Sequence, residues 1–313
     1  MKFNFCDIKT TKDINKANCI THSGTFHADE VFATAILSLI LNDIVIYRAN
    51  EIKQEISTAI VYDVGLGRLD HHQAGGNGQR ENGVSFAACG LVWREYYKEV
   101  LSNIGIDKKD INYLKDQIDK NLIQFIDAND NGITPKISTE YKYVNLANII
   151  AQFNPNWNEN VDSDEKFIDA VNFAKVVLEN EICSEISKFK AKSIVEKAIE
   201  DSKDNIMILD EFMPWKEFIL ESKSKKAKDI LFVVFPSNRG GYNVYAVPKE
   251  AGSFENRKSF PKEWAGLRDE KLQKITGVNS AAFCHIACFI CTAKTKDDAI
   301  KLANLAIENE KGE

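Results

Sequence analysis

Residues 17–41 read ANCITHSGTFHADEVFATAILSLIL: a short apolar run, a polar loop and a longer apolar run in direct succession. Ala17–Thr21 has the composition of a short buried strand, and Ala28–Leu41 has the length and apolar content of a buried helix. The run Val31–Leu41 falls well short of the roughly 20 apolar residues that a membrane-spanning helix requires. We therefore expect a strand–loop–helix unit, the building block of a parallel sheet covered by helices.

The alternation of strand and helix patterns continues downstream and then gives way to helical spacing. Apolar residues recur every three or four positions after the glycine-rich loop 74–78, which predicts helices separated by polar loops. The expected elements are strands at Ile44–Tyr47 and Ala59–Tyr62, a short helix at Ile52–Ser57, and helices at Phe86–Val100, Ile111–Ile126 and Phe167–Ile199.

A second run of strand patterns begins after the long helix. We expect strands at Ile206–Leu209, Ile230–Phe235, Tyr242–Val247 and Ala281–Ile290, followed by an amphipathic helix at Lys296–Glu308. The chain thus reads as α/β: a doubly wound parallel sheet in an N-terminal domain (1–203, including a linker helix) and a smaller C-terminal α/β domain (204–313).

Composition excludes several classes of protein. The formal net charge of −6 argues against a protein that coats nucleic acid through bulk positive charge. Residues 236–275, however, contain eight Lys and Arg but only five Asp and Glu, so an anionic substrate is expected to bind in this segment. The seven cysteines make no disulfide framework, and the N-terminus shows no apolar signal segment, so we expect a cytoplasmic protein without membrane contact.

Four of the five histidines lie between residues 22 and 72, in two short clusters. In the first cluster, His22, His27 and Asp29 lie in or beside the loop between the expected strand and helix. Imidazole nitrogens and a carboxylate at the end of a strand are enough to start a metal site. The alternative is that Asp29 and Glu30 complement the helix dipole and that both histidines are ordinary loop residues.

The second cluster, Asp70-His71-His72-Gln73, is the most informative motif. One histidine can bind a metal ion, its neighbour can contact an anionic oxygen, and Asp70 can accept a hydrogen bond from one imidazole. Asp63 follows the strand Ala59–Tyr62, where a carboxylate can bridge two cations or simply stabilise a turn. Two adjacent exposed histidines remain the alternative for the motif itself.

Together these donors predict a binuclear site made of nitrogen and oxygen ligands. Such a site suits Mn²⁺, Mg²⁺, Zn²⁺ or Fe²⁺. A pair of these ions activates water and stabilises the attacking and leaving oxygens in phosphoryl displacement. Phosphoester hydrolysis is therefore the favoured reaction class.

Several strings also resemble a known family. THSGTFHADE, VYDVG, RLDHHQ and FIDANDNG occur in this order, followed by GGYNVYAVP, GSFENRK, PKEWAGLRDE and FCHIACFICTAKTK. From about Ile20 to Ala306 the chain resembles the melanocyte-proliferating-gene exonuclease family, a branch of the DHH phosphoesterase superfamily. That resemblance implies a parallel α/β domain, a helical linker and a smaller C-terminal α/β domain, with a binuclear metal centre of the Mn²⁺ type.

The resemblance also implies individual ligands. The expected ligands of the first metal ion are His22, His27 and Asp63, and those of the second are Asp29, Asp63, His71 and either Asp127 or Asp130. Asp127 is expected to stay on the helix, whereas Asp130 enters the following Asn-Gly turn. His72 would face the scissile phosphate.

The first motif departs from the wider superfamily, which usually has two aspartates where this chain has His27 and Asp29. The superfamily's histidine lies four residues before the first of these, a position that Ser23 occupies here. His22 lies one residue further away, and a looser loop would absorb the difference.

In the C-terminal domain, Arg239-Gly240-Gly241 resembles the glycine-rich turn with which such domains bind the anionic end of a substrate. Arg239 offers a planar fork for phosphate, although an ordinary hairpin turn explains the same residues. His285 and Lys294 are further candidates for substrate contact. Cys284, Cys288 and Cys291, placed along one strand, would not converge and are expected in the core.

The resemblance implies a metal-dependent 3′–5′ exonuclease that acts on RNA or a short oligonucleotide. His72, Arg239 and His285 are the expected catalytic residues, and His72, Arg239, Gly240, Gly241, His285 and Lys294 the expected substrate-binding residues. One alternative is a hydrolase of pyrophosphate or another small phosphorylated molecule. A second is a metal-binding regulatory module without turnover.

Overall fold

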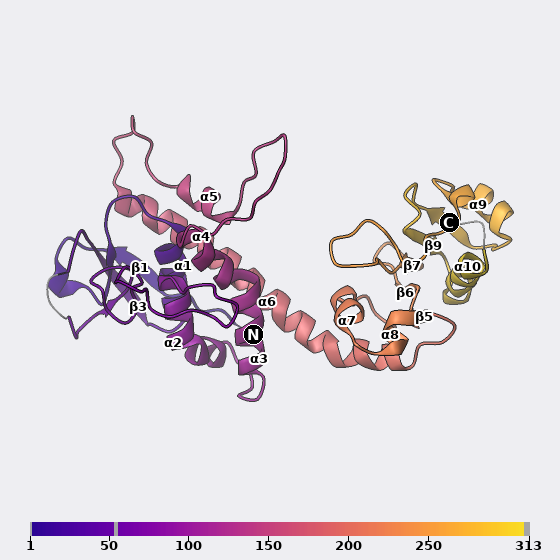
Figure 1. Ribbon diagram of the computed structural model, residues 1–313, viewed down its shortest axis with the longest axis horizontal. Coiled ribbons are helices and arrows are strands. Elements are labelled where there is room, and N and C mark those ends of the chain that lie inside the picture. Colours follow the sequence, from indigo (N-terminus) through magenta and orange to yellow (C-terminus); the bar gives the residue numbers. More distant parts are fainter. Residues whose placement is uncertain (1, 53–55, 310–313) are drawn as a thin grey trace. The chain divides into compact units, whose positions relative to one another are not determined.

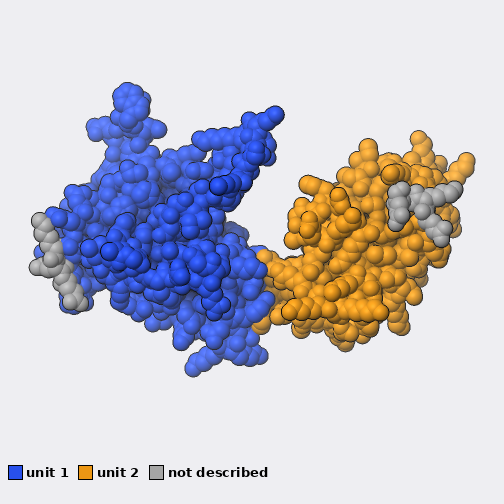
Figure 2. All heavy atoms as spheres, viewed as in Figure 1, with its two compact units in different colours: residues 1–186 blue, residues 187–313 orange. Residues whose placement is uncertain are grey.

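Figure 1 shows the fold of the chain in a computed structural model that describes residues 2–52 and 56–309. The chain forms two compact units, residues 1–186 and 187–313, which Figure 2 shows in blue and orange. The boundary falls within helix α6 (Ser163–Glu200), whose last turns contribute Ala191, Val195 and Ile199 to the core of the second unit. No helix in the described part of the chain is long and apolar enough to cross a membrane.

The first unit is built on a four-stranded parallel sheet in the order β1-β3-β2-β4. Its inner strand β2 carries the residues Cys19, Ile20 and Thr21, which are fully buried, as expected for a parallel strand covered by other elements. The strands are β1 (Asp7–Thr10), β2 (Cys19–His22), β3 (Asp43–Ala49) and β4 (Ile60–Val61). The three expected strands are present, with each end within two residues of its predicted position, and β1 is an addition that its alternating polar sequence concealed.

Three helices of the first unit pack against one another, α1, α2 and α4 (Figure 1). All ten residues of α1 (Ala28–Leu37) are buried, which explains why seven of them are apolar; the buried polar residues are Asp29, Glu30 and Thr34. The other helical elements of this unit are η1 (Ile14–Lys16), α2 (Ala88–Asn103), α3 (Ile111–Ile118), η2 (Asp119–Ile123), α4 (Gln124–Asp130) and α5 (Leu146–Ala151).

Three expectations about helices need correction or fall outside the structure. The first helix ends at Leu37 rather than Leu41, because the chain turns after Ser38. The expected single helix 111–126 is divided by the π-helical segment η2, and Asp130 is the last residue of α4 rather than part of the turn. The helix expected at Ile52–Ser57 lies in part on residues 53–55, outside the described residues.

The second unit contains a mixed sheet in the order β5-β6-β7-β9-β8. β5 and β6 are parallel and the remaining pairs are antiparallel, so the chain as a whole is α/β, as predicted. The strands are β5 (Ile206–Ile208), β6 (Phe232–Pro236), β7 (Tyr242–Ala246), β8 (Ala281–Cys284) and β9 (Ile290–Ala293). The helices are α7 (Lys216–Glu221), α8 (Lys225–Asp229), η3 (Lys262–Trp264), α9 (Asp269–Thr276) and α10 (Lys296–Glu308).

The prediction of one strand across Ala281–Ile290 is wrong. The chain forms a hairpin there, with Cys288 at φ 53° in the turn and Cys284 opposite Cys291 in the ladder. The three cysteines therefore do not lie along one strand, and Cys284 and Cys291 are cross-strand neighbours, contrary to the expectation that they would not converge. All three nevertheless lie in the hydrophobic core of the second unit, as expected.

Candidate metal centre

The candidate site lies at the carboxyl ends of β2 and β4. These strands are neighbours and run parallel, so the residues that follow them meet at one edge of the sheet. His22 is the last residue of β2, and Asp63 follows β4 by two residues. Asp63 has φ 54°, an uncommon value for a residue other than glycine, and its N–H donates to the carbonyl of Leu69 (3.1 Å). Such backbone strain is found preferentially at functional sites.

A cavity of about 980 Å³ opens at this edge. Most of the histidines and carboxylates singled out in the first unit line it, together with one face of α5. The lining includes His22, His27, Asp29, Asp63, Asp70, His71, His72, Asp130, Ala147, Asn148 and Ala151.

On one side of the cavity, His22 is oriented by its own backbone. Its Nδ1 lies 3.0 Å from the carbonyl oxygen of Ser23, so Nδ1–H donates there and Nε2 is left for a ligand. Nε2 lies 2.8 Å from Glu30 Oε1 and 3.4 Å from Asp63 Oδ2. Burial alone would lower the pKa of His22, but the hydrogen bond and charge of Glu30 raise it to about 9. The ring of His27 lies 5.7 Å from that of His22, close enough for both to approach one cation.

Glu30 is a site residue that the sequence motifs do not indicate, because they predict for it only a charge near the helix dipole. Its side chain is fully buried and both oxygens accept a hydrogen bond from the backbone N–H of His27, at 3.0 and 3.1 Å. This is half of a capping box, and the three-residue spacing from His27 to Glu30 was a usable signal. His22, His27 and Glu30 form a group that can hold a metal ion.

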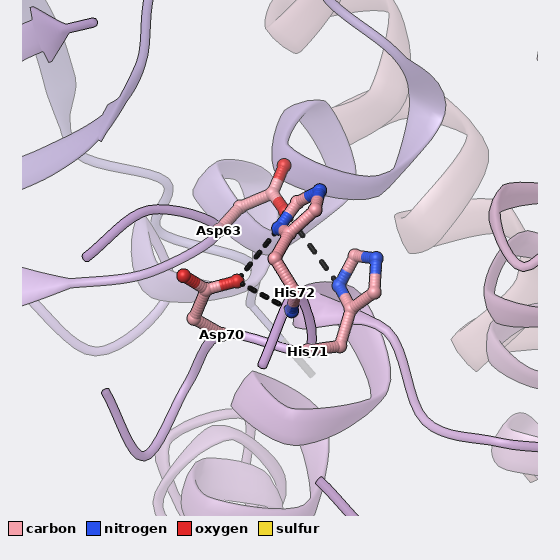
Figure 3. A group of neighbouring side chains, drawn as sticks. All are labelled: Asp63, Asp70, His71 and His72. Atoms are coloured by element: carbon pink, nitrogen blue, oxygen red, sulfur yellow. Dashed lines mark hydrogen bonds and ion pairs between the residues drawn. The ribbon is translucent and has the colours of Figure 1, made fainter. Parts of the chain in front are cut away.

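Figure 3 shows the second group, in which His71 and His72 both approach Asp63 Oδ1, at 3.6 and 3.5 Å, and only His72 also contacts Asp70. His72 Nδ1 lies 2.7 Å from Asp70 Oδ1, and the same oxygen accepts the backbone N–H of His72. Asp70 therefore orients one imidazole, as the motif predicted. The two rings stack with centroids 4.2 Å apart, and His71 Nδ1 lies 3.6 Å from Asp63 Oδ1.

Asp29 and Asp130 approach His71 from two sides. Asp29 Oδ2 lies 3.8 Å from Nδ1, and Asp130 Oδ2 lies 3.0 Å from Nε2. The carboxylate of Asp29 is fully buried and accepts the backbone N–H groups of Ala88 and Cys89 at the start of α2. Asp29, His71 and Asp130 form a further group that can hold a metal ion.

Asp127 and Asp130, the two alternative metal ligands of the 111–130 region, lie in different surroundings. Asp130 lines the cavity and is 19% exposed at the side chain. Asp127 is fully buried beneath the first turn of α2, where it accepts the N–H of Gly90 (2.9 Å) and pairs with Arg80 (2.8 Å). Of the two, Asp130 is the one that contacts His71.

The electrostatics of the cavity favour a bound cation. Burial first, and then the negative charge of Glu30, raise the pKa of Asp63 to about 9, and burial with the charge of Asp63 raises the pKa of Asp29 well above its usual range. Asp63 Oδ1 and His71 Nδ1 are both buried and have no hydrogen-bond partner among the described residues. A divalent cation would offset the crowded negative charge and satisfy both atoms, and the nitrogen and oxygen donors fit Mn²⁺, Mg²⁺, Zn²⁺ or Fe²⁺.

The predicted substrate residues of the second unit fall into two places. Gly240 and Gly241 adopt φ 87° and 72°, and a Cβ atom on Gly241 would meet the carbonyl oxygen of Ala293 at 2.5 Å. The exposed Arg239 therefore belongs to a turn that packs on the backbone next to Lys294. His285 lies in the β8–β9 turn, at the other end of β9, where its Nδ1 accepts the N–H of Ala287 (3.0 Å). Their roles in substrate binding stay predictions.

Fold and site together define an α/β protein with a buried cluster of histidines and carboxylates suited to divalent cations. Residues 18–307 match the MYG1 exonuclease family, described as an uncharacterised protein family (UPF0160). The chain belongs to this family, and the resemblance noted from the sequence motifs is confirmed. The chain is 32% identical in sequence to a MYG1 protein of Saccharomyces cerevisiae, over 96% of this chain and 98% of the yeast protein. It is 29% identical to the human MYG1 exonuclease over 92% of this chain and 85% of the human protein.

Among solved structures, the chain has a weak likeness to RecJ from Thermus thermophilus, crystallised in complex with Mg²⁺. The TM-score is 0.22 at 11% identity, over 75% of this chain and 43% of the RecJ chain. We draw no conclusion from a likeness of this size.

Proposed function

We propose that this protein is a metal-dependent phosphoesterase that acts as a 3′–5′ exonuclease on RNA or short oligonucleotides through a binuclear Mn²⁺ centre. The relatives from human, mouse and cattle that carry the name MYG1 exonuclease support the nuclease assignment. The cluster of nitrogen and oxygen donors in the cavity supports the metal dependence.

The strongest support for a bound metal ion comes from two buried polar atoms. Asp63 Oδ1 and His71 Nδ1 are buried, lie 3.6 Å apart and have no hydrogen-bond partner among the described residues. Leaving two such atoms unsatisfied is costly for a folded protein unless a ligand or ion completes their coordination. A cation that both atoms bind would remove this cost.

The proposed ligands are divided between two ions. The first ion would be held by His22, His27 and Asp63, with Glu30 beside His22, and the second by Asp29, Asp63, His71 and Asp130. Two divalent ions so placed would lower the pKa of a water molecule and offset the negative charge of the phosphate.

His72 is proposed to contact the substrate rather than a metal ion. Its side chain is 56% exposed, and the bond from Nδ1 to Asp70 leaves Nε2 as the atom that can reach a phosphate oxygen. Arg239 is proposed to bind phosphate through its guanidinium, and Gly240 and Gly241 to let the phosphate approach the turn closely because they carry no side chain, with Lys294 and His285 as further contacts.

A direct assay tests the proposal. The purified protein, supplied with Mn²⁺, is incubated with the same short RNA labelled either at its 5′ or at its 3′ end, with short DNA, and with pyrophosphate. A 3′–5′ exonuclease releases the 3′ label at once and converts the 5′-labelled strand into a ladder of shorter products. The variant Asp63→Asn serves as the matched inactive protein.

The other outcomes separate the alternatives. Hydrolysis of pyrophosphate without degradation of RNA would replace the exonuclease with a hydrolase of small phosphorylated molecules. If Mn²⁺ binds and none of these substrates is hydrolysed, the proposed activity is wrong and a regulatory metal-binding module takes its place.

A further inference from the structure

We propose that Arg80 and Asp127 form a positioning pair that sets the places of Asp29 and Asp130 through the first turn of α2 and the last turn of α4. The inference rests on the proposed metal centre and assigns to Asp127 a role other than that of a ligand. It names Arg80, which no sequence motif singled out, as a residue on which metal binding depends.

Arg80 connects two helical segments from the loop that precedes α2. Its Nε and Nη2 donate to the two carboxylate oxygens of Asp119, at 2.7 and 2.6 Å. Nη2 also donates to Asp127 Oδ2 (2.8 Å), and the guanidinium lies over the ring of Phe86, 4.3 Å from its centroid. The side chain of Arg80 is 8% exposed, and a forked, charge-assisted pair at that depth holds its partners in a narrow range of positions.

Three successive backbone N–H groups of α2 are bound by carboxylates. Asp29 accepts from Ala88 (2.8 Å) and Cys89 (2.7 Å), and Asp127 accepts from Gly90 (2.9 Å). These donors have no partner within the helix, and the positive end of the helix dipole favours the negative charge. The first turn of α2 therefore fixes the positions of the Asp29 and Asp127 carboxylates.

Gly90 shows how closely α4 approaches α2. A Cβ atom at this position would lie 1.9 Å from Asp127 Oδ2 and 2.9 Å from the ring of Phe86. Asp127 is held by Arg80, and the ring of Phe86 lies against the guanidinium groups of Arg80 and Arg94, so a larger side chain cannot be accommodated without moving α4. Glycine is required here for space rather than for backbone conformation.

The connection to the metal centre runs along α4. Asp130 lies three residues after Asp127, close to one helical turn, and places its Oδ2 3.0 Å from His71 Nε2. Moving Asp127 away from α2 would move Asp130 with it. If α2 moved instead, it would disturb Asp29, both of whose oxygens accept hydrogen bonds from that helix.

Binding of Mn²⁺ to the purified protein tests the inference. Arg80→Lys keeps the positive charge but cannot span both carboxylates, so the affinity of one of the two Mn²⁺ ions should fall about 10–100-fold, as is typical for partners of metal ligands. Isothermal titration gives the affinities, and electron paramagnetic resonance gives the number of ions at saturation, which should stay at two. At saturating Mn²⁺ the KM for RNA should be unchanged.

Arg94→Lys is the matched control. Arg94 lies over the same Phe86 ring at 4.7 Å but is exposed and donates to the carbonyl of Asn77. Its substitution should leave both Mn²⁺ affinities unchanged. Equal affinities in the Arg80 and Arg94 variants would overturn the positioning role.

A second variant keeps the test decisive if Arg80→Lys does not fold. Asp127→Asn can still accept from Gly90 but loses the ion pair, so weaker binding of one Mn²⁺ with two ions at saturation supports the inference. Permanent loss of one ion would make Asp127 a ligand and overturn it. If the unaltered protein binds no Mn²⁺, the proposed function fails first, and that result is distinct from both of these.

Discussion

The cavity of the first unit and the glycine turn of the second offer two different solutions to the binding of charge. In the cavity, Asp29 and Asp63 are both buried; backbone N–H groups of α2 hold the carboxylate of Asp29, whereas Asp63 Oδ1 has no hydrogen-bond partner among the described residues. Burial and mutual repulsion raise the pKa of both carboxyl groups, a cost that a cation offsets. In the turn, Arg239 is exposed and only the backbone is constrained, by the contact between Gly241 and Ala293. The first region is organised before any ligand arrives, whereas the second leaves its charged side chain free to adapt.

The largest effect is expected at Asp63, which faces both histidine groups. Asp63→Asn removes the negative charge proposed to be shared by two metal ions, so Mn²⁺-dependent turnover should fall to background while the circular dichroism spectrum is retained. Asp116→Asn, at an exposed carboxylate of α3, is the control and should keep full activity. Substantial activity in the Asp63 variant would rule out its bridging role.

A smaller effect is expected at Arg239, whose substitution should change the kinetics with RNA without changing the affinity of the cavity for Mn²⁺. Loss of one charge-assisted contact to phosphate costs about 1.5–3 kcal/mol, so Arg239→Ala should lower kcat/KM for RNA by roughly 10–150-fold. Affinity for Mn²⁺ should not change. Lys271→Ala, an exposed cation of the same basic segment, is the matched control. An Arg239 variant with normal kinetics would remove the turn from the substrate site.

The metal-free protein should also show the cost of the crowded cavity as a pH dependence. The folded-state pKa of Asp63 is raised from 3.8 to about 9, and that of His22 from 6.5 to about 9. Both groups therefore hold protons more tightly in the folded than in the unfolded state, and stability present at low pH is lost as the pH rises toward 9. With a chelator, Tm should fall by several degrees between pH 6 and pH 9.

Added Mn²⁺ should oppose this fall of Tm with rising pH, because the ion takes the place of the protons on Asp63 and His22 and binds best when both groups are deprotonated. The stabilisation by Mn²⁺, measured as the difference in Tm with and without the ion, should therefore grow from pH 6 to pH 9. A constant or shrinking difference would contradict the proposed role of these groups.

The smallest effects concern the glycine turn itself. Gly241→Ala meets both a positive φ and the carbonyl of Ala293, so it should destabilise the protein by about 1–3 kcal/mol. Gly240 also has a positive φ but faces open space, so Gly240→Ala should cost less, about 1 kcal/mol. Chemical denaturation measures both, and equal costs would show that the contact with Ala293 is unimportant.

Much of the fold and part of the site could be predicted from local sequence. The strand, loop and helix around His22 and Asp29 follow from short-range patterns, and so does the pairing of Asp70 with His72, two residues apart. The hairpin at Ala281–Ile290 could not be read in this way. Its turn depends on Cys288 adopting φ 53°, a conformation that its residue type does not signal.

The amino-acid sequence alone was sufficient to locate the histidines and carboxylates at strand ends, because strand length, loop position and donor chemistry are local properties. Only the tertiary structure distinguished the positions of Asp127 and Asp130 and showed that Glu30 lies beside His22 and that Arg80 pairs with Asp127. The hydrogen bond from Gly90 to Asp127 spans 37 residues, and the pair of Arg80 with Asp127 spans 47. Such contacts depend on how α2 and α4 pack against each other and on the π-helical segment that precedes α4, and neither is encoded in a local motif.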